Sequence, residues 1–578
     1  MNADQLLRLY DRVSEAEDAV PRLRRFVLDL AVRGKLVPQD PEDEPASELL
    51  KRIEREKARL VKAGEIKGER IPTRRLSTAP RFSIPQGWTW TSLGGCCISI
   101  TDGDHQPPPK ADRGIPFLVI GDVRTGTINY SADRQVPEAY YEALDRIRKP
   151  QKGDILYTLV GSFGIPVEVR QATEFCVQRH IGILRPSAHI DTTFLRHCLE
   201  SGFVFVQADT CATGIAQKTI PLTALRLFAI PLPPLAEQHR IVAKVEELMA
   251  LLDQIEAARA GREETRNRLT AATLARLTDP KADAPAATRF ALDTLAPLTT
   301  RPDQIKTLRQ TILNLAVRGK LVPQDPSDEP AAELLKRIAI ERKALVSAKR
   351  IRREEPLAAP EEDAFPHLIP ESWLWTKVGT AVLFTEYGTS SKSEPTQSGV
   401  PVLTMGNIQD GKVIWGNEKR IPTTSEELPT LYVKQFDLLY NRTNSAELVG
   451  KTGIYLGSDD RFSFASYLIR LRPSHVNTNP TYLNIAMNAP SFRETQILPL
   501  IKQQTGQANV NGTSLKNMLF PLPPIAEQHR IVAKVDTLMR LLDDLEAALS
   551  ASATTRARLL DTILRAALAA PEPARAAA

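Results

Sequence analysis

Three residues of the first half have the types and spacing of a nuclease-like constellation. Asp154 precedes a hydrophobic stretch, and Glu168-Val-Arg170 follows further along the chain. A pair of carboxylates beside a basic side chain could serve phosphodiester hydrolysis. The matching stretch of the second half keeps Asp437 but loses the other residues. The pattern therefore gives little support to hydrolysis by this chain.

A second pattern with possible chemistry is Asn479-Pro-Thr-Tyr482, which resembles the NPPY-type motif of adenine methyltransferases. The aligned place in the first half, Asp191-Thr-Thr-Phe194, lacks the proline and ends in phenylalanine. No glycine-rich cofactor loop stands at a suitable strand end, and no GxxxxGK[ST] loop for ATP occurs. The motif instead predicts a helix start with Asn479 as its cap.

Two histidines, His239 and His529, stand in identical AEQHRI contexts and could invite a catalytic interpretation. Neither motif holds a nucleophile or a metal-ligand partner. A structural or subunit-docking role is therefore favoured for both.

The elements around these motifs occur twice. The segment LAVRGKLVPQD runs from Leu30 to Asp40 and again from Leu315 to Asp325. PLPPLAEQHRIVAKV begins at Pro231, and PLPPIAEQHRIVAKV begins at Pro521. Such repeats indicate a tandem duplication, with pseudo-twofold symmetry as the expected consequence.

The repeated blocks predict long helices. Apolar residues recur at spacings of four and three, which is the heptad seam of helices that pair lengthwise. We expect one helix from Ala236 to Leu277 and a second after Pro521, packed as an antiparallel coiled coil. Gly34 and Gly319 are predicted to end shorter helices. The seam, expected to serve packing or subunit docking, comprises Ile241, Val245, Leu248, Leu252, Ile255, Ile531, Val535, Leu538, Leu542 and Leu545.

Between the repeated blocks lie two diverged segments with short apolar runs broken by glycine and aspartate, which indicate strands and turns. The predicted fold is mixed α/β, with two globular domains separated by conserved helices. Of Trp88, Trp90, Trp373 and Trp375, one in each pair is expected in the core. The expected segments are a helical 1–80, a globular domain 81–230, a central helical region with linker 231–364, a second globular domain 365–520, a helix 521–570 and a disordered tail 571–578.

Composition excludes some classes of protein. The chain has 578 residues, a net charge of +6 and five cysteines, all in the first half. No apolar run is long enough to span a membrane, and the N-terminus lacks the features of a signal peptide. A reduced cytoplasmic protein fits best, and the charge permits a polyanionic partner. The basic run 146–152 suits either phosphate tracking or a solvated face.

These motifs, in this order and arranged twice, resemble the specificity subunit of type I restriction–modification systems. IPQGWTWTSLG (84–94) and IPESWLWTKVG (369–379) are similar to the start of that family's target-recognition domains. TGIAQKTIPLTAL (213–225) and TGQANVNGTSL (505–515) resemble their ends.

The resemblance implies a non-catalytic subunit. Each target-recognition domain would read one half of a bipartite, asymmetric site in double-stranded DNA, with the helices fixing the spacer between the halves. Two methyltransferase subunits, which use S-adenosylmethionine to methylate adenine at N6, would dock on it. Two motor–nuclease subunits using ATP and Mg²⁺ are further partners that the family allows. No cofactor or metal is expected in this chain.

Arginine suits guanine edges, while asparagine and glutamine suit adenine edges. Polar and basic residues in loops of the diverged segments are therefore the candidate DNA contacts. They are Lys110, Arg113, Ser162, Arg179, Gln217 and Lys218 in the first domain and Lys392, Asn441, Arg442, Asn444, Gln507 and Asn509 in the second. The main rival hypothesis is a protein–protein scaffold, or a decayed orphan copy, that no longer reads DNA sequence. An enzyme acting alone is disfavoured by the missing motifs.

Overall fold

The computed structural model describes most of the chain. The described residues are 8, 16, 18–66, 82–105, 108–124, 126–214, 217–278, 298–504 and 507–569. The predicted tail, and the Ala/Pro/Thr-rich linker of the central region apart from its two ends, lie outside these ranges. Within them, no helix combines the length and apolar character that crossing a bilayer requires.

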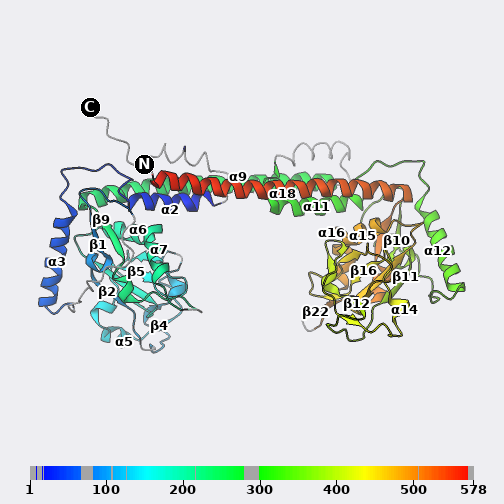
Figure 1. Cartoon of the computed structure of the whole chain (residues 1–578), viewed down its shortest axis with the longest axis horizontal. Coiled ribbons are helices and arrows are strands. Elements are labelled where there is room, and N and C mark those ends of the chain that lie inside the picture. The colour runs from blue at the N-terminus through cyan, green and yellow to red at the C-terminus, as the bar shows by residue number, and fades with distance from the viewer. Residues whose placement is uncertain are drawn as a thin grey trace. The chain divides into compact units, whose positions relative to one another are not determined.

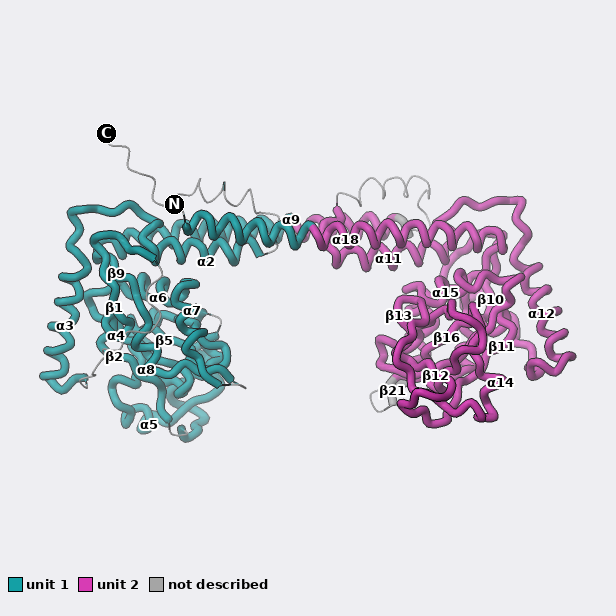
Figure 2. The backbone as a smooth tube through the Cα atoms, viewed as in Figure 1, with its two compact units in different colours: residues 1–262, 552–578 teal, residues 263–551 magenta. Residues whose placement is uncertain are grey.

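The chain forms two compact units, which Figure 2 shows in different colours. Unit 1 comprises residues 1–262 and 552–578, and unit 2 comprises residues 263–551. Helix α9 (Leu235–Thr278) begins in unit 1 and ends in unit 2, whereas α18 (Ile525–Ala569) begins in unit 2 and ends in unit 1. Within unit 1, Leu560 and Leu564 near the end of α18 share a core cluster with Ile241 near the start of α9, as the predicted antiparallel pair requires. The division of the chain into six segments stays a prediction.

In unit 1 the helical part consists of α2, α3, the first turns of α9 and the end of α18. Helix α2 spans Ala19–Ala31 and α3 spans Ala46–Lys62. The α9 seam residues Ile241 to Leu252 are buried in one core cluster with Leu23, Leu560 and Leu564. Just past the end of α2, Gly34 has φ +68°, a left-handed conformation that suits glycine and stops the helix.

Unit 2 repeats this arrangement with α11 (Pro302–Ala316), α12 (Ala331–Ser347) and the start of α18. Gly319 follows α11 with φ +66°. The predicted ends of both short helices are therefore confirmed. Ile531 and Val535 of the α18 seam lie in the core cluster of this unit.

The described strands of the diverged segment of unit 1 form three sheets, and Figure 1 labels several of these strands. The central sheet is antiparallel in the order β2-β8-β5-β6, and β3 pairs antiparallel with β4 and parallel with β7 in a smaller one. A third sheet joins β1 to β9, so that both ends of the segment meet where α9 begins. The strands are β1 (Thr89–Ser92), β2 (Cys97–Asp102), β3 (Ile115–Leu118), β4 (Gln135–Val136), β5 (Ile155–Thr158), β6 (Pro166–Glu168), β7 (Cys176–Val177), β8 (Ile181–Pro186) and β9 (Ala229–Leu232). The helices among them are α4 (Leu93–Cys96), α5 (Glu138–Ala143), α6 (Thr192–Glu200), α7 (Gly202–Cys211) and α8 (Leu222–Leu225).

Unit 2 reproduces this topology and extends it. Its central sheet has the order β11-β20-β16-β18-β14-β13, its smaller sheet the order β15-β12-β19, and β10 pairs with β23 at the helical end. A further sheet, β17-β22-β21, has no counterpart among the described strands of unit 1. The strands are β10 (Leu374–Lys377), β11 (Val382–Tyr387), β12 (Val400–Leu403), β13 (Ile408–Gln409), β14 (Lys412–Val413), β15 (Arg420–Ile421), β16 (Leu438–Asn441), β17 (Thr443–Asn444), β18 (Thr452–Ile454), β19 (Ser463–Phe464), β20 (Leu468–Pro473), β21 (Lys502–Gln504), β22 (Gln507–Asn509) and β23 (Leu519–Leu522). The helices are α13 (Val378–Ala381), α14 (Leu428–Leu431), α15 (Pro480–Asn488), α16 (Pro490–Phe492) and α17 (Gly512–Asn517).

The strand registers allow the two units to be compared residue by residue. Thr101 and Ile183 face each other in unit 1, and Glu386 and Arg470 do so at the same place in unit 2. Both first strands carry an irregularity near their start, between Cys97 and Ser99 and between Val382 and Phe384. The fold is therefore mixed α/β and duplicated, as the sequence predicts.

Candidate nucleic-acid interface

Each diverged segment is fixed to its helices by a buried glutamate in the first turn of a long helix. Glu237 accepts hydrogen bonds from the indole N–H of Trp88 at 2.9 Å and from the amide of Gln39 at 2.7 Å. In unit 2, Glu527 accepts from Trp373 at 2.8 Å and from Gln324. Burial raises the pKa of both carboxyls, and the hydrogen bonds oppose that rise. Trp88 is thus the core residue of its pair, as expected, whereas Trp373 and Trp375 are both buried.

The AEQHRI blocks contact the helix that follows each central sheet. The side-chain oxygen of Gln238 accepts from the backbone N–H of Asp191 at 3.0 Å, and Gln528 does the same for Asn479 at 2.8 Å. His239 and His529 are exposed beside these caps. His529 Nδ1 lies 3.1 Å from the side-chain nitrogen of Asn479. Whether the two histidines have a structural or a docking role stays a prediction.

The two motifs that invited catalytic interpretations have structural partners. Asp154 is buried in a bidentate ion pair with Arg185, with distances of 2.9 and 2.8 Å. Asn479 caps α15 by accepting from the N–H groups of Thr481 and Tyr482, which confirms the predicted helix start. Tyr482 is fully buried and donates to the carbonyl of Pro521 at 2.8 Å. Among the residues that the structure describes, no group of three potential metal ligands occurs.

Four of the candidate contacts of unit 1 come together beside the end of β5 and the start of β8, the inner strands of its central sheet. The backbone N–H of Gly161, next to Ser162, donates to the carbonyl of Lys218 at 3.0 Å. The N–H of Leu159 donates to the carbonyl of His180, which follows Arg179, at 2.9 Å. Ser162, Arg179, Gln217 and Lys218 are all exposed there. Loops far apart in sequence therefore form one polar surface, which we call the unit 1 reading edge.

Aromatic side chains adjoin this edge. Phe163 stacks on Phe205 with ring centroids 6.1 Å apart, and the Lys218 ammonium lies 5.9 Å from the Phe163 centroid. Lys218 also pairs with Asp209 at 2.6 Å. Phe163 was not among the predicted contacts because those were polar and basic residues, although it stands beside Ser162 in the sequence.

Lys110 and Arg113 are exposed on a different part of unit 1. Their segment joins the smaller sheet, where the N–H of Ala111 donates to the carbonyl of Gln135 at 3.1 Å. In the basic run, Arg148 donates to the carbonyl of Gly103 at 2.7 Å and Lys149 to that of Glu142 at 2.9 Å, whereas Lys152 is exposed. Part of the run therefore holds the fold together rather than facing solvent.

In unit 2 the corresponding place is the extra sheet. Thr443 pairs with Asn509 and Asn444 pairs with Ala508, and the N–H of Val510 donates to the carbonyl of Arg442 at 2.9 Å. The Thr443 hydroxyl donates to the side-chain oxygen of Asn509 at 3.2 Å. Gln507 belongs to β22, and the position of its side chain lies outside what the structure describes. We call this surface the unit 2 reading edge.

Arg442 is held in a defined position at this edge. Its guanidinium lies 5.1 Å from the ring centroid of Tyr387 and donates to the carbonyl of Ser466 at 3.3 Å. The Tyr387 hydroxyl in turn accepts from the N–H of Gly512 at 2.6 Å. Tyr387 was missed because tyrosine was not among the residue types sought as base readers. Lys392 is exposed on the segment that follows Tyr387.

Asn441 requires a correction. It was predicted as a loop residue that contacts DNA, but it ends strand β16 and is only 1% exposed. Its backbone pairs with Lys451 and Gly450 at 2.9 and 2.8 Å, while its side-chain oxygen has no hydrogen-bond partner among the described residues. Asn441 therefore lies beneath the reading edge rather than on it.

The heptad seam serves packing, which is the first of its two expected roles. Ile241, Val245, Leu248 and Leu252 are buried within unit 1, and Ile531, Val535 and Leu542 are buried in the second copy. Ile255, Leu538 and Leu545 are half-buried. Side chains covered by this chain's own helices are not available to dock another subunit. The seam is a packing surface.

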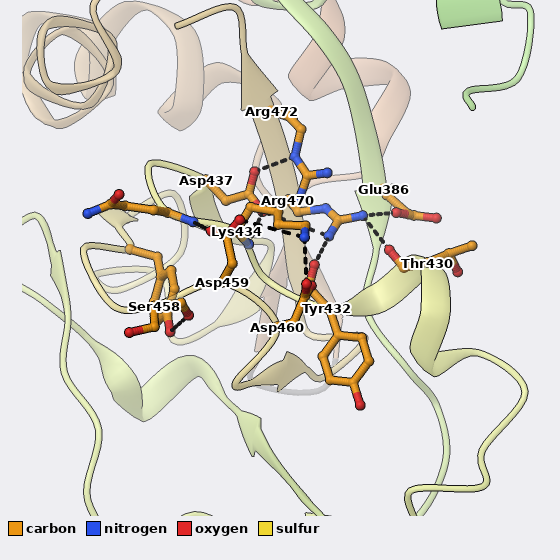
Figure 3. Close-up of polar contacts among 12 residues, drawn as sticks. Glu386, Thr430, Tyr432, Lys434, Asp437, Ser458, Asp459, Asp460, Arg470 and Arg472 are labelled. Carbon is orange, nitrogen blue, oxygen red and sulfur yellow. Dashed lines mark hydrogen bonds and ion pairs between the residues drawn. The ribbon is translucent and has the colours of Figure 1, made fainter. Parts of the chain in front are cut away.

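A buried charge cluster supports the sheet of unit 2 (Figure 3). Arg470 is 1% exposed; it pairs with Glu386 and donates to the carbonyls of Tyr432 and Thr430 at 2.7 and 2.8 Å. Asp437 accepts two hydrogen bonds from Arg472, at 2.7 and 2.6 Å. Because burial disfavours its charged form, the pKa of Arg470 is lowered, and the carboxylates oppose that change.

Comparison with known proteins gives a consistent result. The sequence model of a family described as "Type I restriction modification DNA specificity domain" matches residues 106–260 and 383–555. The EcoEI and EcoAI type I restriction enzyme specificity subunits of Escherichia coli are 30% and 31% identical, each over 95% of this chain and 94% of the relative. The HsdS subunit from Thermoanaerobacter tengcongensis aligns over 84% of this chain and 98% of its own, with 18% identity and a TM-score of 0.41.

Both halves of the chain match the family, at positions that include most of each diverged segment and the start of each long helix. The relatives are matched over nearly their full length. The chain belongs to the family of DNA specificity subunits of type I restriction–modification systems.

Proposed function

We propose that each unit of this DNA specificity subunit reads one half of a bipartite, asymmetric DNA site through its reading edge. The carrying observation is the convergence of sequence-distant polar residues at the same place in both units. In unit 1 the loops at Ser162, Arg179 and Lys218 meet, and in unit 2 those at Arg442, Ser466 and Asn509 meet. Base edges are read by such side chains, while phosphate contacts add affinity.

The difference between the edges supports an asymmetric site. Unit 1 presents serine, arginine, glutamine and lysine, and unit 2 presents arginine and asparagine on an additional sheet. Two unlike reading surfaces on one chain can select a non-palindromic sequence, which two identical ones cannot. Each half-site then adds its own discrimination.

The family implies DNA and methyltransferase partners, and this subunit contributes recognition rather than catalysis. The finer composition is our proposal: two methyltransferase subunits that use S-adenosylmethionine, and two motor–nuclease subunits that use ATP and Mg²⁺. With the seam buried, their docking must use other helix faces or the exposed blocks around His239 and His529. We place the complex in the cytoplasm, where its DNA is.

The test is to co-express the chain with its adjacent methyltransferase and map N6-methyladenine across the host DNA by single-molecule sequencing. The expected result is a split motif with one methylated adenine in each half, lost when the chain is deleted. Exchanging residues 81–230 for those of a relative should change one half of the motif alone. A soluble, active complex that methylates without any motif would favour the scaffold or decayed-copy alternative.

A further inference from the structure

Unit 2 carries a cleft on its smaller sheet, and none of the residues named for the unit 2 reading edge lines it. Its volume is about 260 Å³. Val400 and Phe462 contribute apolar lining, Trp415 forms a wall, and Glu418, Arg420 and Arg461 provide the charges. Trp415 packs on Tyr455 and Phe462 with centroids 5.5 Å apart, yet it is 37% exposed. A large aromatic side chain is thus held rigidly with part of its surface open to solvent.

The charged side chains of the cleft differ in their hydrogen bonds and in their exposure to solvent. Arg420 donates to the carbonyl of Gly399 at 2.7 Å, and one carboxylate oxygen of Glu418 accepts from Asn407 at 3.0 Å and from the N–H of Gly416. Arg461 is exposed, and its guanidinium lies 5.4 Å from the Phe462 centroid. Two arginines outweigh one glutamate, so the cleft has a net positive charge.

The same place in unit 1 has the opposite charge. Pro401 pairs with Arg420 as Pro116 pairs with Gln135, and Val402 pairs with Ser463 as Phe117 pairs with Cys176. By these registers, Glu174 is the residue of unit 1 at the position that Arg461 has in unit 2. The remaining equivalents, counted from the same registers, are Tyr130 for Trp415 and Asp133 for Glu418. The basic character therefore belongs to unit 2 alone.

We propose that this cleft binds one nucleotide unit, with its base against Trp415 and its phosphate at Arg461. An open aromatic face is a sequence-tolerant platform for a base, and arginine binds phosphate through a fork of N–H donors. The source is either a nucleotide of the bound DNA outside the half-site or a free mononucleotide.

The position of the cleft is compatible with DNA as the source. Glu394 and Arg420 exchange backbone hydrogen bonds of 2.9 Å, so the segment that carries exposed Lys392 borders the cleft. Phe462 leads through β19 to Ser466, whose carbonyl anchors Arg442 at the unit 2 reading edge. The DNA arm rests on the proposed function, since it assumes that this edge meets DNA.

The experiment uses the full-length chain in complex with its methyltransferase. Arg461→Glu and Trp415→Leu are compared with Arg353→Glu, which changes the same charge at an exposed site in residues 347–373. Binding to a duplex that contains the methylated motif is measured at several salt concentrations, with hydroxyl-radical footprints. Binding of a fluorescent adenosine diphosphate is measured by anisotropy without DNA. Exchanging the charges in a Glu174→Arg/Arg461→Glu double variant preserves the net charge of the chain.

If DNA is the source, Arg461→Glu and Trp415→Leu weaken duplex binding about tenfold, and Arg461→Glu reduces the salt slope by about one phosphate contact. The footprint shortens beside the half-site of unit 2, while the methylation motif stays unchanged. If a free nucleotide is the source, the wild type binds the fluorescent nucleotide and both variants lose it. Unchanged binding of both probes, or losses equal to those of Arg353→Glu, overturns the proposal. If the complex with the wild-type chain methylates DNA without any sequence motif, the proposed function is refuted instead.

Discussion

The two units agree in one region and differ in another. They agree in how each recognition segment is attached to its helices, and they differ in the interior of the central sheet. The attachment is the same in both: a glutamate accepts from a tryptophan indole at 2.9 Å in unit 1 and 2.8 Å in unit 2. The interior is not, because the Thr101–Ile183 pair of unit 1 is replaced by Glu386–Arg470 in unit 2. The fixed part positions a domain, and the variable part can support a different reading edge.

The variable interior also changes how each unit should respond to substitution and pH. Unit 2 buries more ionisable groups where unit 1 has apolar ones: Arg470 replaces Ile183, and His367 stands where Phe82 does. Near the helices, unit 1 has the ionisable residue and unit 2 has the neutral one. Asp29 accepts from the N–H of Phe203 at 3.2 Å, whereas Asn314 accepts from Ser491 at 3.0 Å.

Replacing Arg470 should have the largest effect. Arg470→Ile leaves the carbonyls of Thr430 and Tyr432 without their donor and Glu386 without its partner, so unit 2 should lose about 3–5 kcal/mol. Pulse proteolysis with identification of the fragments by mass spectrometry would measure this loss separately for each unit. Unit 1, which already has isoleucine at this place, should be unaffected.

The matched control is Lys434→Ala at the exposed end of the same cluster. Lys434 pairs with Asp460 at 2.6 Å, but its side chain is 37% exposed and that of Asp460 50%, so the loss should stay below about 1 kcal/mol. Equal losses for both variants would show that the buried cluster does not stabilise unit 2. A Glu386→Thr/Arg470→Ile double variant, which copies unit 1, should recover part of the loss.

Some of this could be predicted from the sequence and some could not. The long helices were predictable because their heptad seam continues over many turns, and Asn479 because cap, proline and apolar residues fall in fixed order. Asn441 was misplaced because strand residues alternate between faces, so an error of one position moves a side chain from surface to interior. Arg470 was missed because arginine is rarely buried unless it is paired, and its partner Glu386 is distant in sequence.

The reading edges were predicted only in part, for a related reason. Ser162 and Lys218 were found because polar loop residues are natural base readers, but their proximity depends on sheet pairing that no local pattern encodes. The supporting aromatics Tyr387 and Phe163 were not sought, since aromatic residues usually indicate core. The seam was recognised because its spacing continues over many turns, and its packing between this chain's own helices follows from that pattern.

Acid should destabilise unit 2 more than unit 1. Burial lowers the pKa of His367 to about 4, while an unfolded histidine titrates near 6.5. As the pH falls from 6.5 towards 4, the unfolded state gains a proton that the folded state refuses, which costs unit 2 up to about 3 kcal/mol. Burial raises the pKa of Asp29, which favours unit 1 as the pH falls. At Glu200, burial also acts to raise the pKa, but His197 and Arg196 lower it overall, which opposes that gain.

Pulse proteolysis between pH 7 and pH 4.5 would show this difference, and His367→Phe should remove most of it. That substitution copies Phe82, which packs against Trp90 with centroids 5.2 Å apart as His367 does against Trp375 at 5.0 Å. The comparison between units cancels the raised pKa values of Glu237 and Glu527, which are common to both. If the variant keeps the full acid sensitivity, His367 is not its cause.

Alanine at Arg442 should alter specificity in one half-site. Because Tyr387 and the carbonyl of Ser466 hold the guanidinium in place, Arg442 is suited to read one base, and its loss should cost about 1–3 kcal/mol of discrimination there. Methylation mapping would show degeneracy at one position. Lys218→Ala in unit 1 is the contrasting variant. The Lys218 ammonium already pairs with Asp209, so we expect it to add charge rather than to read one base. Its removal should therefore weaken binding to all DNA sequences by a similar factor. Uniform weakening by Arg442→Ala would make it a phosphate contact instead.

The smallest effect should come from the attachment that the units share. Glutamine at position 237 or 527 offers one acceptor oxygen where the carboxylate offers two, so either the indole N–H or the neighbouring amide loses its partner. Removing a buried charge offsets part of that cost, which leaves a loss of about 1 kcal/mol. Glu237→Gln and Glu527→Gln should each destabilise their own unit by the same amount under pulse proteolysis. Unequal losses would mean that the diverged interiors influence the stability of the attachment. The two units could then not be divided into a fixed part and a variable part.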